Sequence, residues 1–464
     1  MRRSLLHQTI SPKVQMTTTW DHVLRTALIN LHAFEFGYTV AFTGATLQSM
    51  IDAVDLCGGA DLCAEASFVA SAAPLGALLA AAVAGRLLDA HGRRAFLIAV
   101  SGLWVVGYVV VACASSLLGF ALGRAVAGAA MGATSVAVPV YAAELAPPKL
   151  RGPLGGLFNV FISAGILAVF ALGARGTDDG VWRWMALAAV APALAVGLGL
   201  HRGWVPESPR WLAQQGRAAE AKEAAEHLFG RGAAADEACT VPEPAKRRAS
   251  QRSVAVGVGV VGCFAFCGNS CIQAYMSVVL EGAGLSEASA RAGAITYAST
   301  QFVFAVLMAL YGVARFGRRP LLIASAMGAT AALTAMSTFT ETQEGLSASL
   351  AADAYIAAVT LGLSTLSWVY CAEVLPDSER GRGMAYATVL FWGVTFASLQ
   401  LFDVAVATLS VAGVLGLFAL FSAGGALFCY AFVVETRGAA LSDVQRLFSD
   451  QPPSEGDALL APRV

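Results

Sequence analysis

The charged residues of this largely apolar sequence recur in matched phrases whose composition suits ion pairing. "GRLLDAHGRR" (85–94) returns as "GVARFGRR" (312–319), and "YAAELAPPKLRG" (141–152) returns as "YCAEVLPDSERG" (370–381). Arginine and glutamate in such phrases can form pairs that break and re-form when packed elements move against one another. We expect a gate of ion pairs from the equivalent residues Arg93, Arg94, Glu144, Arg151 and Glu207 in the first copy and Arg318, Arg319, Glu373, Arg380 and Glu435 in the second. The alternative is that the exposed members serve only as charges at the ends of apolar runs, because single surface pairs contribute only ~0–1 kcal/mol.

Ionisable residues also lie inside the apolar runs, and Glu35 and Arg124 are the two that suggest a function. Glu35 falls near the middle of the run 23–47, on one helical face with His32 and Thr39. A charge at membrane depth is costly unless it is paired or neutralised, which makes such a residue a functional candidate. Arg124 is the expected partner of Glu35, which could take up a proton and release the arginine. The alternative is a neutral Glu35 that is hydrogen-bonded within a packed helix interface.

The nine cysteines form no metal-binding pattern. Cys57 and Cys63 share the segment "CGGADLC", where an oxidising compartment would permit a disulfide; two free thiols are the alternative. Neither a GxxxxGK[ST] phosphate loop nor an HExxH sequence occurs. The sequence therefore predicts no cofactor and no metal, and it argues against ATP-driven pumping by this chain alone.

Composition places these residues in a membrane protein. The 464 residues are 57% hydrophobic and only 13% charged, with a mean hydropathy of +0.65, whereas soluble domains carry about 25% charged residues. A helix needs about 20 apolar residues to cross the hydrocarbon. Twelve candidate spans lie near 23–47, 66–85, 96–114, 117–140, 154–174, 184–202, 253–279, 292–312, 321–339, 354–371, 384–403 and 410–433.

Lysine and arginine predict the orientation of these spans. With both termini in the cytoplasm, all 30 of these residues except Arg124, Arg175, Arg183 and Arg291 lie on the cytoplasmic side, as the positive-inside rule requires. One large polar insert follows the sixth span, and its Ala- and Glu-rich stretch 210–229 predicts helix. The predicted divisions are a cytoplasmic N-terminus (1–22), a first bundle (23–202), a cytoplasmic linker with short helices (203–252), a second bundle (253–433) and a cytoplasmic tail (434–464).

The matched phrases indicate an internal duplication. Equivalent residues such as Glu144 and Glu373 are separated by 229 residues, a period that covers six spans. An even number of spans keeps the two halves in the same orientation, which is the parallel-repeat plan of a transporter. The sequence therefore predicts an all-α membrane protein with twelve transmembrane helices in two pseudo-symmetric six-helix bundles.

These phrases resemble the signatures of the sugar porter family of the major facilitator superfamily, over nearly the whole chain. "GRLLDAHGRR" resembles the signature between helices 2 and 3, and "GRAVAGAAMGATSVAVPVYAAELAPPKLRG" (123–152) resembles helix 4 and the loop after it. "VPESPRWL" (205–212) is similar to the signature after helix 6, and "VETRG" (434–438) to the one after helix 12. The resemblance implies the twelve-helix fold and transport of a hexose, pentose or polyol by alternating access, with no nucleic-acid partner.

The resemblance also implies a substrate site between the halves, with changes in the second half. Asn159 stands where sugar porters carry a sugar-binding glutamine, and Trp368 and Trp392 are retained. Phe264 and Phe391 replace amide residues of the family pattern. Because a site built to bond hydroxyls rejects groups that leave its polar atoms unpaired, an altered ring predicts altered selectivity.

Amides at other positions could replace part of that ring. Asn269 and Gln273 are four residues apart and share one helix face, and Gln301 lies beside a position that is an asparagine in the family. The alternative is that Gln273 and Gln301 only satisfy neighbouring helices. The candidate substrate-binding residues are Asn159, Asn269, Gln273, Gln301, Trp368, Trp392 and Thr39.

Thr39 also bears on energy coupling. Proton-coupled members of the family usually carry aspartate at this position after Gly-Tyr, and passive members lack it. The expectation is therefore facilitated diffusion, with proton symport through Glu35 and Arg124 as the alternative.

Three functions remain open from the sequence. The first is a carrier for a sugar or related polyol, and the second is a carrier of another small organic solute on the same fold. The third is a non-transporting nutrient sensor, although the short tail 434–464 has no evident signalling module. The expected partners are a small-molecule substrate, the lipid bilayer and, for symport, protons. We expect a multi-pass integral protein of the plasma membrane.

Overall fold

The computed structural model describes residues 12–54, 57, 63–147, 150–174, 180–230, 239, 251–312, 316–375, 380–437 and 448. No β-strand occurs among these residues. Most of the predicted tail, part of the predicted linker and the first 11 residues lie outside them.

The first half of the chain forms six long helical segments, one of which is broken once. They are α1 (Pro12–Val54), α2 (Ala64–His91), α3 (Arg93–Cys113), α4 (Leu117–Leu145), α5 (Arg151–Gly173) and the pair α6 (Val181–Ala188) and α7 (Val190–His201). Gly92 separates α2 from α3 with a φ of 87°, which strongly favours glycine. Ser116 begins α4 as an N-cap that accepts a hydrogen bond from the Gly119 N–H.

The second half repeats this plan with more breaks. Its helices are α11 (Gln251–Phe266), α12 (Asn269–Ala274), α13 (Met276–Gly282), α14 (Glu287–Leu307) with the π-helix η1 (Met308–Gly312), α16 (Arg318–Glu341), α17 (Gly345–Leu361), α18 (Leu363–Val374), α19 (Arg380–Gln400) and α20 (Phe402–Phe432). Gly268 adopts a φ of 83° between α11 and α12. Such breaks at membrane depth are tolerated where the freed backbone groups are buried in protein or line a cavity.

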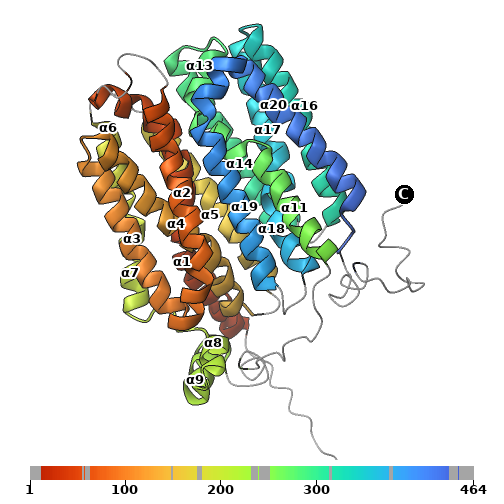
Figure 1. Cartoon of the computed structure of the whole chain (residues 1–464). Coiled ribbons are helices and arrows are strands. Elements are labelled where there is room, and N and C mark those ends of the chain that lie inside the picture. Colours follow the sequence, from red (N-terminus) through yellow and green to blue (C-terminus); the bar gives the residue numbers. More distant parts are fainter. Residues whose placement is uncertain are drawn as a thin grey trace, which may run out of the picture.

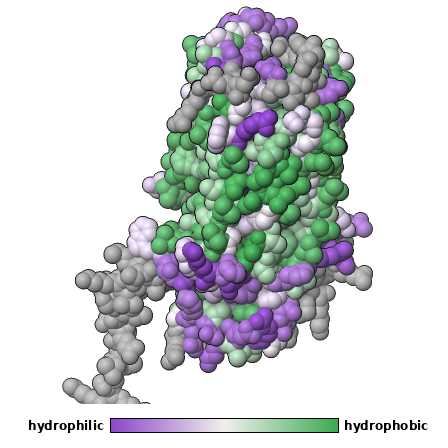
Figure 2. Space-filling model, turned by 90° about the vertical axis from the view of Figure 1, so that its left-hand side faces the viewer, coloured by the Kyte–Doolittle hydropathy of each residue, from purple (hydrophilic) through white to green (hydrophobic). Residues whose placement is uncertain are grey.

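The two halves stand side by side with their helices roughly along one direction (Figure 1). Ten helical segments are long and apolar enough to cross a membrane, and α1 and α19 complete the twelve. Figure 2 shows a broad apolar belt between two hydrophilic ends. The belt explains why residues such as Leu79, Leu118 and Leu427 are exposed: in the bilayer they face lipid.

The two ends of the molecule are distinguished by what they carry. Two short helices, α8 (Pro209–Gln214) and α9 (Ala218–Phe229), lie beyond the bundle at one end, called here the insert end (Figure 1). Cys57 and Cys63 lie in the connection from α1 to α2 at the opposite end, called here the disulfide end. The stretch 210–229, which the sequence predicts as helix, is interrupted at Gly216, whose φ is 75°.

Small residues allow the helices of the first half to approach closely. A Cβ added to Gly128 of α4 would lie 2.0 Å from the Ala73 carbonyl oxygen of α2, and one added to Gly132 would lie 2.3 Å from that of Ala77. Packing of this kind is the main source of association between helices in lipid, where burial against another apolar surface gains little.

Several helices begin before the predicted spans: α1 begins at Pro12 rather than at 23, and α17 begins at Gly345 rather than at 354. The last helix also begins earlier, and it contains a break. The sequence places the last span at 410–433, whereas α20 begins at Phe402 and has a break at Ser410, where φ is 66°. The apolar run predicted from the sequence therefore starts at the break, and the turns before it form a separate helical piece.

Candidate functional site

Aromatic side chains from both halves meet at the centre of the molecule. The Phe36 ring of α1 lies 5.7 Å from the Trp392 ring of α19 and 6.2 Å from the Phe158 ring of α5, measured between ring centroids. Phe391 joins this group from the second half, 5.0 Å from Trp392 and 5.5 Å from Trp368. The candidate tryptophans Trp368 and Trp392 are therefore brought together through Phe391.

Phe264 extends the aromatic group within the second half. Its ring stacks on Phe391 with centroids 5.3 Å apart and an interplanar angle of 21°. Phe264 and Phe391 both replace amides of the sugar porter pattern described above, and here their two rings pack against each other. Trp392 is 2% exposed, and its indole N–H has no hydrogen-bond partner among the described residues.

The candidate amides fall into two environments. Asn159 on α5 is partly exposed, and its side chain bonds to none of the described residues. Gln273, by contrast, is buried and donates to the Gln301 side chain at 2.9 Å. Asn269 accepts from the Tyr297 hydroxyl at 3.4 Å. The structure thus gathers Asn269, Gln273 and Gln301 between α12 and α14, while Asn159 remains available on the first half.

Thr39 faces the interior of the first half. Its hydroxyl shares a 2.6 Å hydrogen bond with the Tyr108 hydroxyl of α3. Arg124 of α4 donates to the Thr39 carbonyl oxygen at 2.9 Å, and its guanidinium lies 5.8 Å from the Phe42 ring centroid. Thr39 is therefore part of a bonded network rather than a free group at the centre.

The expected pairing of Glu35 with Arg124 is absent among the described residues. Instead, the Glu35 carboxyl oxygen lies 2.6 Å from Nδ1 of His32, one turn back on α1, and His32 Nε2 lies 3.0 Å from the Ser101 hydroxyl of α3. Both His32 and Glu35 are 0% exposed. The physical reason is direction: the three-residue spacing places the His32 and Glu35 side chains on one face, where they bond to each other, whereas Arg124 reaches the α1 backbone one turn further along.

The gate residues of the first half form one connected group at the insert end. Arg93 makes a two-pronged contact with Glu144, at 2.8 Å and 3.0 Å. The Glu207 carboxylate accepts from the main-chain N–H groups of Arg93 and Arg94 at the start of α3. It also accepts from the Ser208 N–H. Negative charge at a helix N-terminus is favourable, so Glu207 stabilises the turn between α2 and α3.

The second half repeats this arrangement. Arg318 contacts Glu373 at 3.1 Å, and Glu435 accepts from the main-chain N–H groups of Arg318 and Arg319 at the start of α16. Thr436 donates to the other oxygen of Glu373 at 2.6 Å.

Every one of these gate contacts joins residues of the same half. An ion pair between the halves, which the sequence suggested for one state of the gate, does not occur among the described gate residues in this conformation. Arg151 and Arg380 begin α5 and α19, and their side chains lie outside the described residues.

Glu207 also lines a cavity of about 570 Å³ between α3 and the two insert helices. Burial raises the pKa of the Glu207 carboxyl above its ordinary value, although the three N–H groups that bond to it act in the opposite direction. Trp211 of α8 closes one side of this cavity and donates through its indole N–H to the Asp89 carbonyl oxygen at 2.8 Å.

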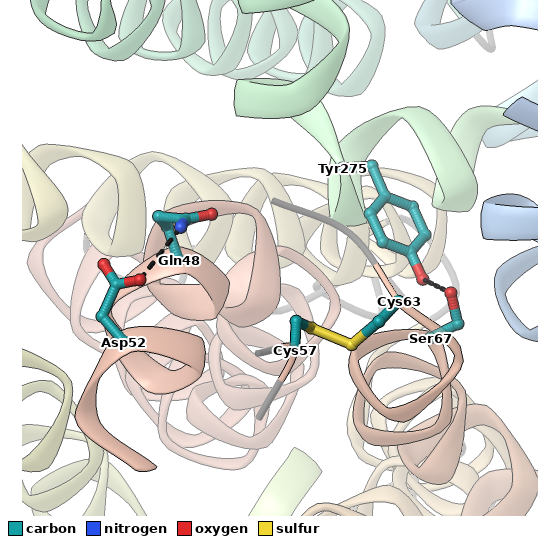
Figure 3. Close-up of a disulfide and its surroundings, with 6 residues drawn as sticks. All are labelled: Gln48, Asp52, Cys57, Cys63, Ser67 and Tyr275. Atoms are coloured by element: carbon teal, nitrogen blue, oxygen red, sulfur yellow. Dashed lines mark hydrogen bonds between the residues drawn. A yellow bond between two sulfur atoms is a disulfide. The ribbon is translucent and has the colours of Figure 1, made fainter. Parts of the chain in front are cut away.

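At the disulfide end, hydrogen bonds cross between the halves. The Tyr275 hydroxyl of the second half lies 3.2 Å from the Ser67 hydroxyl of α2, close to the Cys57–Cys63 disulfide (Figure 3). Ser71 of α2 donates to the Gln400 side chain at 2.7 Å. Among the two cysteine alternatives, the structure contains the disulfide.

Three residues of this centre were not singled out by the sequence. Phe36 carries the aromatic contact between halves, although it lies within the quoted segment "EFGYTVAFT". Tyr108 and Tyr297 each bond to a candidate residue from a neighbouring helix. A tyrosine or phenylalanine in an apolar span does not by itself indicate which helix it contacts, because an apolar ring is compatible with both lipid and a packed interior.

Comparison with known proteins places the whole chain among transporters. The family described as "Sugar (and other) transporter" matches residues 26–448. Sugar transporter ERD6-like 7 of Arabidopsis thaliana is 30% identical over 451 residues, covering 92% of this chain and 94% of that protein. The major myo-inositol transporter IolT of Bacillus subtilis is 28% identical, covering 82% of this chain and 85% of that protein.

Solved structures show the same fold. The inward open conformation of the xylose transporter XylE from E. coli superposes with a TM-score of 0.78 at 25% identity, covering 91% of this chain and 99% of the other. XylE, there described as a proton:xylose symporter, bound to 6-bromo-6-deoxy-D-glucose gives a TM-score of 0.76 at 24% identity, covering 92% and 99%.

Proposed function

Because the chain belongs to the family of sugar (and other) transporters, we propose that it moves a sugar or a related polyol by alternating access to one site between its halves. It is a carrier and not an enzyme. One observation carries the location of the site: the buried Trp392 N–H has no partner among the described residues, at the point where Phe36 and Trp392 join the two halves. A buried donor without a partner is costly, and a solute hydroxyl would satisfy it.

The proposed site combines stacking surfaces with few polar groups, as small-molecule sites usually do. Phe36, Trp368 and Trp392 supply aromatic faces, and Asn159 supplies an amide whose side chain is unbonded within the described part of the chain. Asn269 and the pair Gln273–Gln301 lie between α12 and α14 and bond with their neighbours. We expect these buried amides to position α12 and α14, or to exchange their mutual bonds for bonds to the solute.

We propose that the insert end is cytoplasmic and that the membrane is the plasma membrane. The lysine and arginine distribution supports this orientation, since the positive-inside rule places such residues in cytoplasmic loops. The disulfide at the opposite end fits an oxidising exterior.

We propose that the gate contacts make each half rigid at its insert end. Glu207 and Glu435 each fix the first turn of a helix, and Arg93 and Arg318 each tie that helix to the end of another in the same half. Such contacts let each half move as a body, which alternating access requires. We expect Arg151 and Arg380, whose side chains lie outside the described part of the structure, to supply charges with which the halves engage each other in the opposite state.

For energetics we propose facilitated diffusion. Glu35 is bonded to His32 inside the first half and is 0% exposed, so neither water nor solute reaches it in this conformation. Proton symport is the second candidate, and one observation favours it. Arg124 is a buried cation that bonds to a carbonyl oxygen and has no carboxylate within ion-pair distance among the described residues. Loss of the proton that His32 and Glu35 share would supply the missing negative charge.

Uptake into proteoliposomes tests these proposals together. Proteoliposomes that contain the purified protein are loaded with D-glucose, D-xylose, myo-inositol or a set of unrelated small organic solutes. Counterflow of the same labelled solute from outside is then measured. Counterflow of a sugar or polyol is the expected result; counterflow only of another solute would replace the substrate class. Binding without counterflow would favour a sensor. Accumulation above equilibrium under an imposed proton gradient, abolished by Glu35→Gln, would replace facilitated diffusion with symport.

A further inference from the structure

The contact that closes the disulfide end is formed by main chain on both sides. A Cβ added to Gly44 of α1 would lie only 2.2 Å from the carbonyl oxygen of Gln273 in α12. It would also lie 3.2 Å from the Phe170 ring of α5. The first contact is with backbone, which cannot rotate away as a side chain can, so α1 and α12 can meet this closely only through a glycine.

A hydrogen bond between the halves lies at the same point. The Ser277 hydroxyl of α13 donates to the Gly44 carbonyl oxygen at 2.9 Å. Two residues earlier in the chain, the Tyr275 hydroxyl reaches Ser67 of α2, close to the disulfide (Figure 3). The Ser277–Gly44 hydrogen bond therefore holds the second half against α1 at Gly44.

Close approaches of glycine to backbone also occur within the first half, where they have a different meaning. A Cβ on Gly37 would lie 1.9 Å from the Ile162 carbonyl oxygen, and one on Gly165 would lie 1.9 Å from that of Phe34. These contacts join α1 to α5 inside one rigid half. The Gly44–Gln273 contact joins two halves that must separate and meet in each cycle, if the proposed function is right.

We propose that Gly44 is a positioning residue of the transport cycle: its lack of a side chain allows the disulfide end to close, and a side chain there would hold that end open. The proposal rests on the alternating access proposed above. In the open state a methyl group at position 44 would meet only the Phe170 ring of its own half, a side chain that can shift by a few tenths of an ångström. It would clash with backbone only on closure, so it would remove one conformation without unfolding the protein.

The test compares three glycine variants that differ in where the added methyl group falls. Gly44→Ala places it between the halves, Gly37→Ala places it within the first half, and Gly102→Ala places it where no heavy atom lies within 4 Å. Each is made alone and with Ser67→Cys, because Ser67 is fully buried in the closed conformation and a thiol there reports opening. Cys113→Ser is included throughout, since Cys113 is an exposed free cysteine.

Labelling by a membrane-impermeant maleimide and thermal melting need no solute, so they test Gly44 even where the transported solute is unknown. We expect the maleimide to label the thiol of Ser67→Cys at least tenfold faster when Gly44→Ala is also present than in the parent protein, which lacks a glycine substitution. The melting temperatures of the two proteins should differ by only a few degrees. Gly37→Ala should melt much lower, and Gly102→Ala should match the parent in both measurements. Ser277→Ala, which removes only the hydrogen bond, should increase labelling less than Gly44→Ala does.

Counterflow then links opening to transport. Gly44→Ala should exchange solute at least tenfold more slowly than Gly102→Ala while still binding it from the disulfide end. Unchanged labelling in Gly44→Ala, whether or not exchange is lost, would overturn the proposal, and so would a melting loss equal to that of Gly37→Ala. Absence of counterflow in the parent protein itself would instead contradict the proposed function and leave the labelling result to decide the role of Gly44.

Discussion

Arg93 and Arg318 occupy equivalent turns of the two halves, yet their ion pairs are buried to different extents. The Arg93 and Glu144 side chains are 6% and 10% exposed, and they share two hydrogen bonds. The Arg318 and Glu373 side chains are 15% and 29% exposed, and Thr436 shares the carboxylate. Arginine and glutamate at the same repeat positions therefore form a buried ion pair in the first half and a partly solvated ion pair in the second.

The interiors of the halves differ more than their ends. The first half contains a bonded polar chain in which Arg124, Thr39 and Tyr108 follow one another, with His32 and Glu35 beside them. At the corresponding depth the second half has the aromatic group of Phe264, Phe391, Trp368 and Trp392 and the amide cluster around Gln273. The difference teaches that the repeat preserves the turns that build the fold, whereas the two interiors have diverged to separate tasks.

The largest expected effect compares the two buried arginines. Arg93→Ala leaves Glu144 buried without its partner, and breaking a buried pair typically costs about 3–5 kcal/mol. Arg318→Ala removes a bond to a more exposed carboxylate and should cost about 1.5–3 kcal/mol. Melting of the two variants in the same detergent should show the larger decrease for Arg93→Ala. Equal decreases would mean that burial does not distinguish the two pairs.

A smaller effect separates the two asparagines. Asn159→Ala should raise the apparent substrate constant severalfold and leave the melting temperature unchanged, because the side chain is partly exposed and an unmade hydrogen bond to the solute costs about 1–3 kcal/mol. Asn269→Ala should lower the melting temperature, because it leaves the buried Tyr297 hydroxyl without its acceptor. Counterflow kinetics and melting, measured on both variants, would contradict this division if Asn269→Ala changed only the substrate constant.

A pH-dependent effect should distinguish Glu207 from a residue that merely caps a helix. Because burial raises the pKa of Glu207 in the folded protein, the folded state holds its proton at a pH where the unfolded chain has lost it. Stability from this group is therefore greatest at low pH and decreases as the pH rises through the ordinary value of 4.5 and up to the raised one.

The melting temperature of the wild type, measured relative to that of Glu207→Gln, should accordingly decrease as the pH is raised from about 4.5 to 7. Glu435→Gln is the matched variant in the second half and measures the loss of the cap. A wild-type advantage over Glu207→Gln that grows with pH would contradict the sign of this prediction.

The smallest effect is expected at Glu35. Under facilitated diffusion, Glu35→Gln should leave counterflow and its pH dependence unchanged, because glutamine can keep a hydrogen bond to His32 and the group does not face the centre. Counterflow is measured across a pH series for the wild type, Glu35→Gln and His32→Gln. A pH dependence in the wild type that both variants abolish would show that the polar chain of the first half takes part in the cycle.

Much of the fold was determined by the sequence itself. The apolar runs predicted the helical segments, the repeated phrases predicted two matching halves, and the fold of known sugar transporters confirms that architecture. Equivalent glutamates such as Glu207 and Glu435 were recognised as a pair from spacing alone, and the structure gives them the same contacts. Local sequence is sufficient for these features because a membrane span must satisfy its own backbone, and a turn between spans must be built from residues next to it.

Tertiary structure decided which faces of the helices meet. The partner of Glu35 is His32 rather than Arg124, the gate contacts stay within each half, and Phe36 rather than Thr39 reaches the centre. Gly44 became visible as a contact only when α12 was placed against α1. The physical reason is that lipid is as apolar as the packed interior, so the hydrophobic pattern that reveals the buried face of a helix in a soluble protein is nearly absent here. The sequence of a helix that is apolar on all sides predicts where the helix crosses the membrane. It does not predict the direction in which any one side chain points.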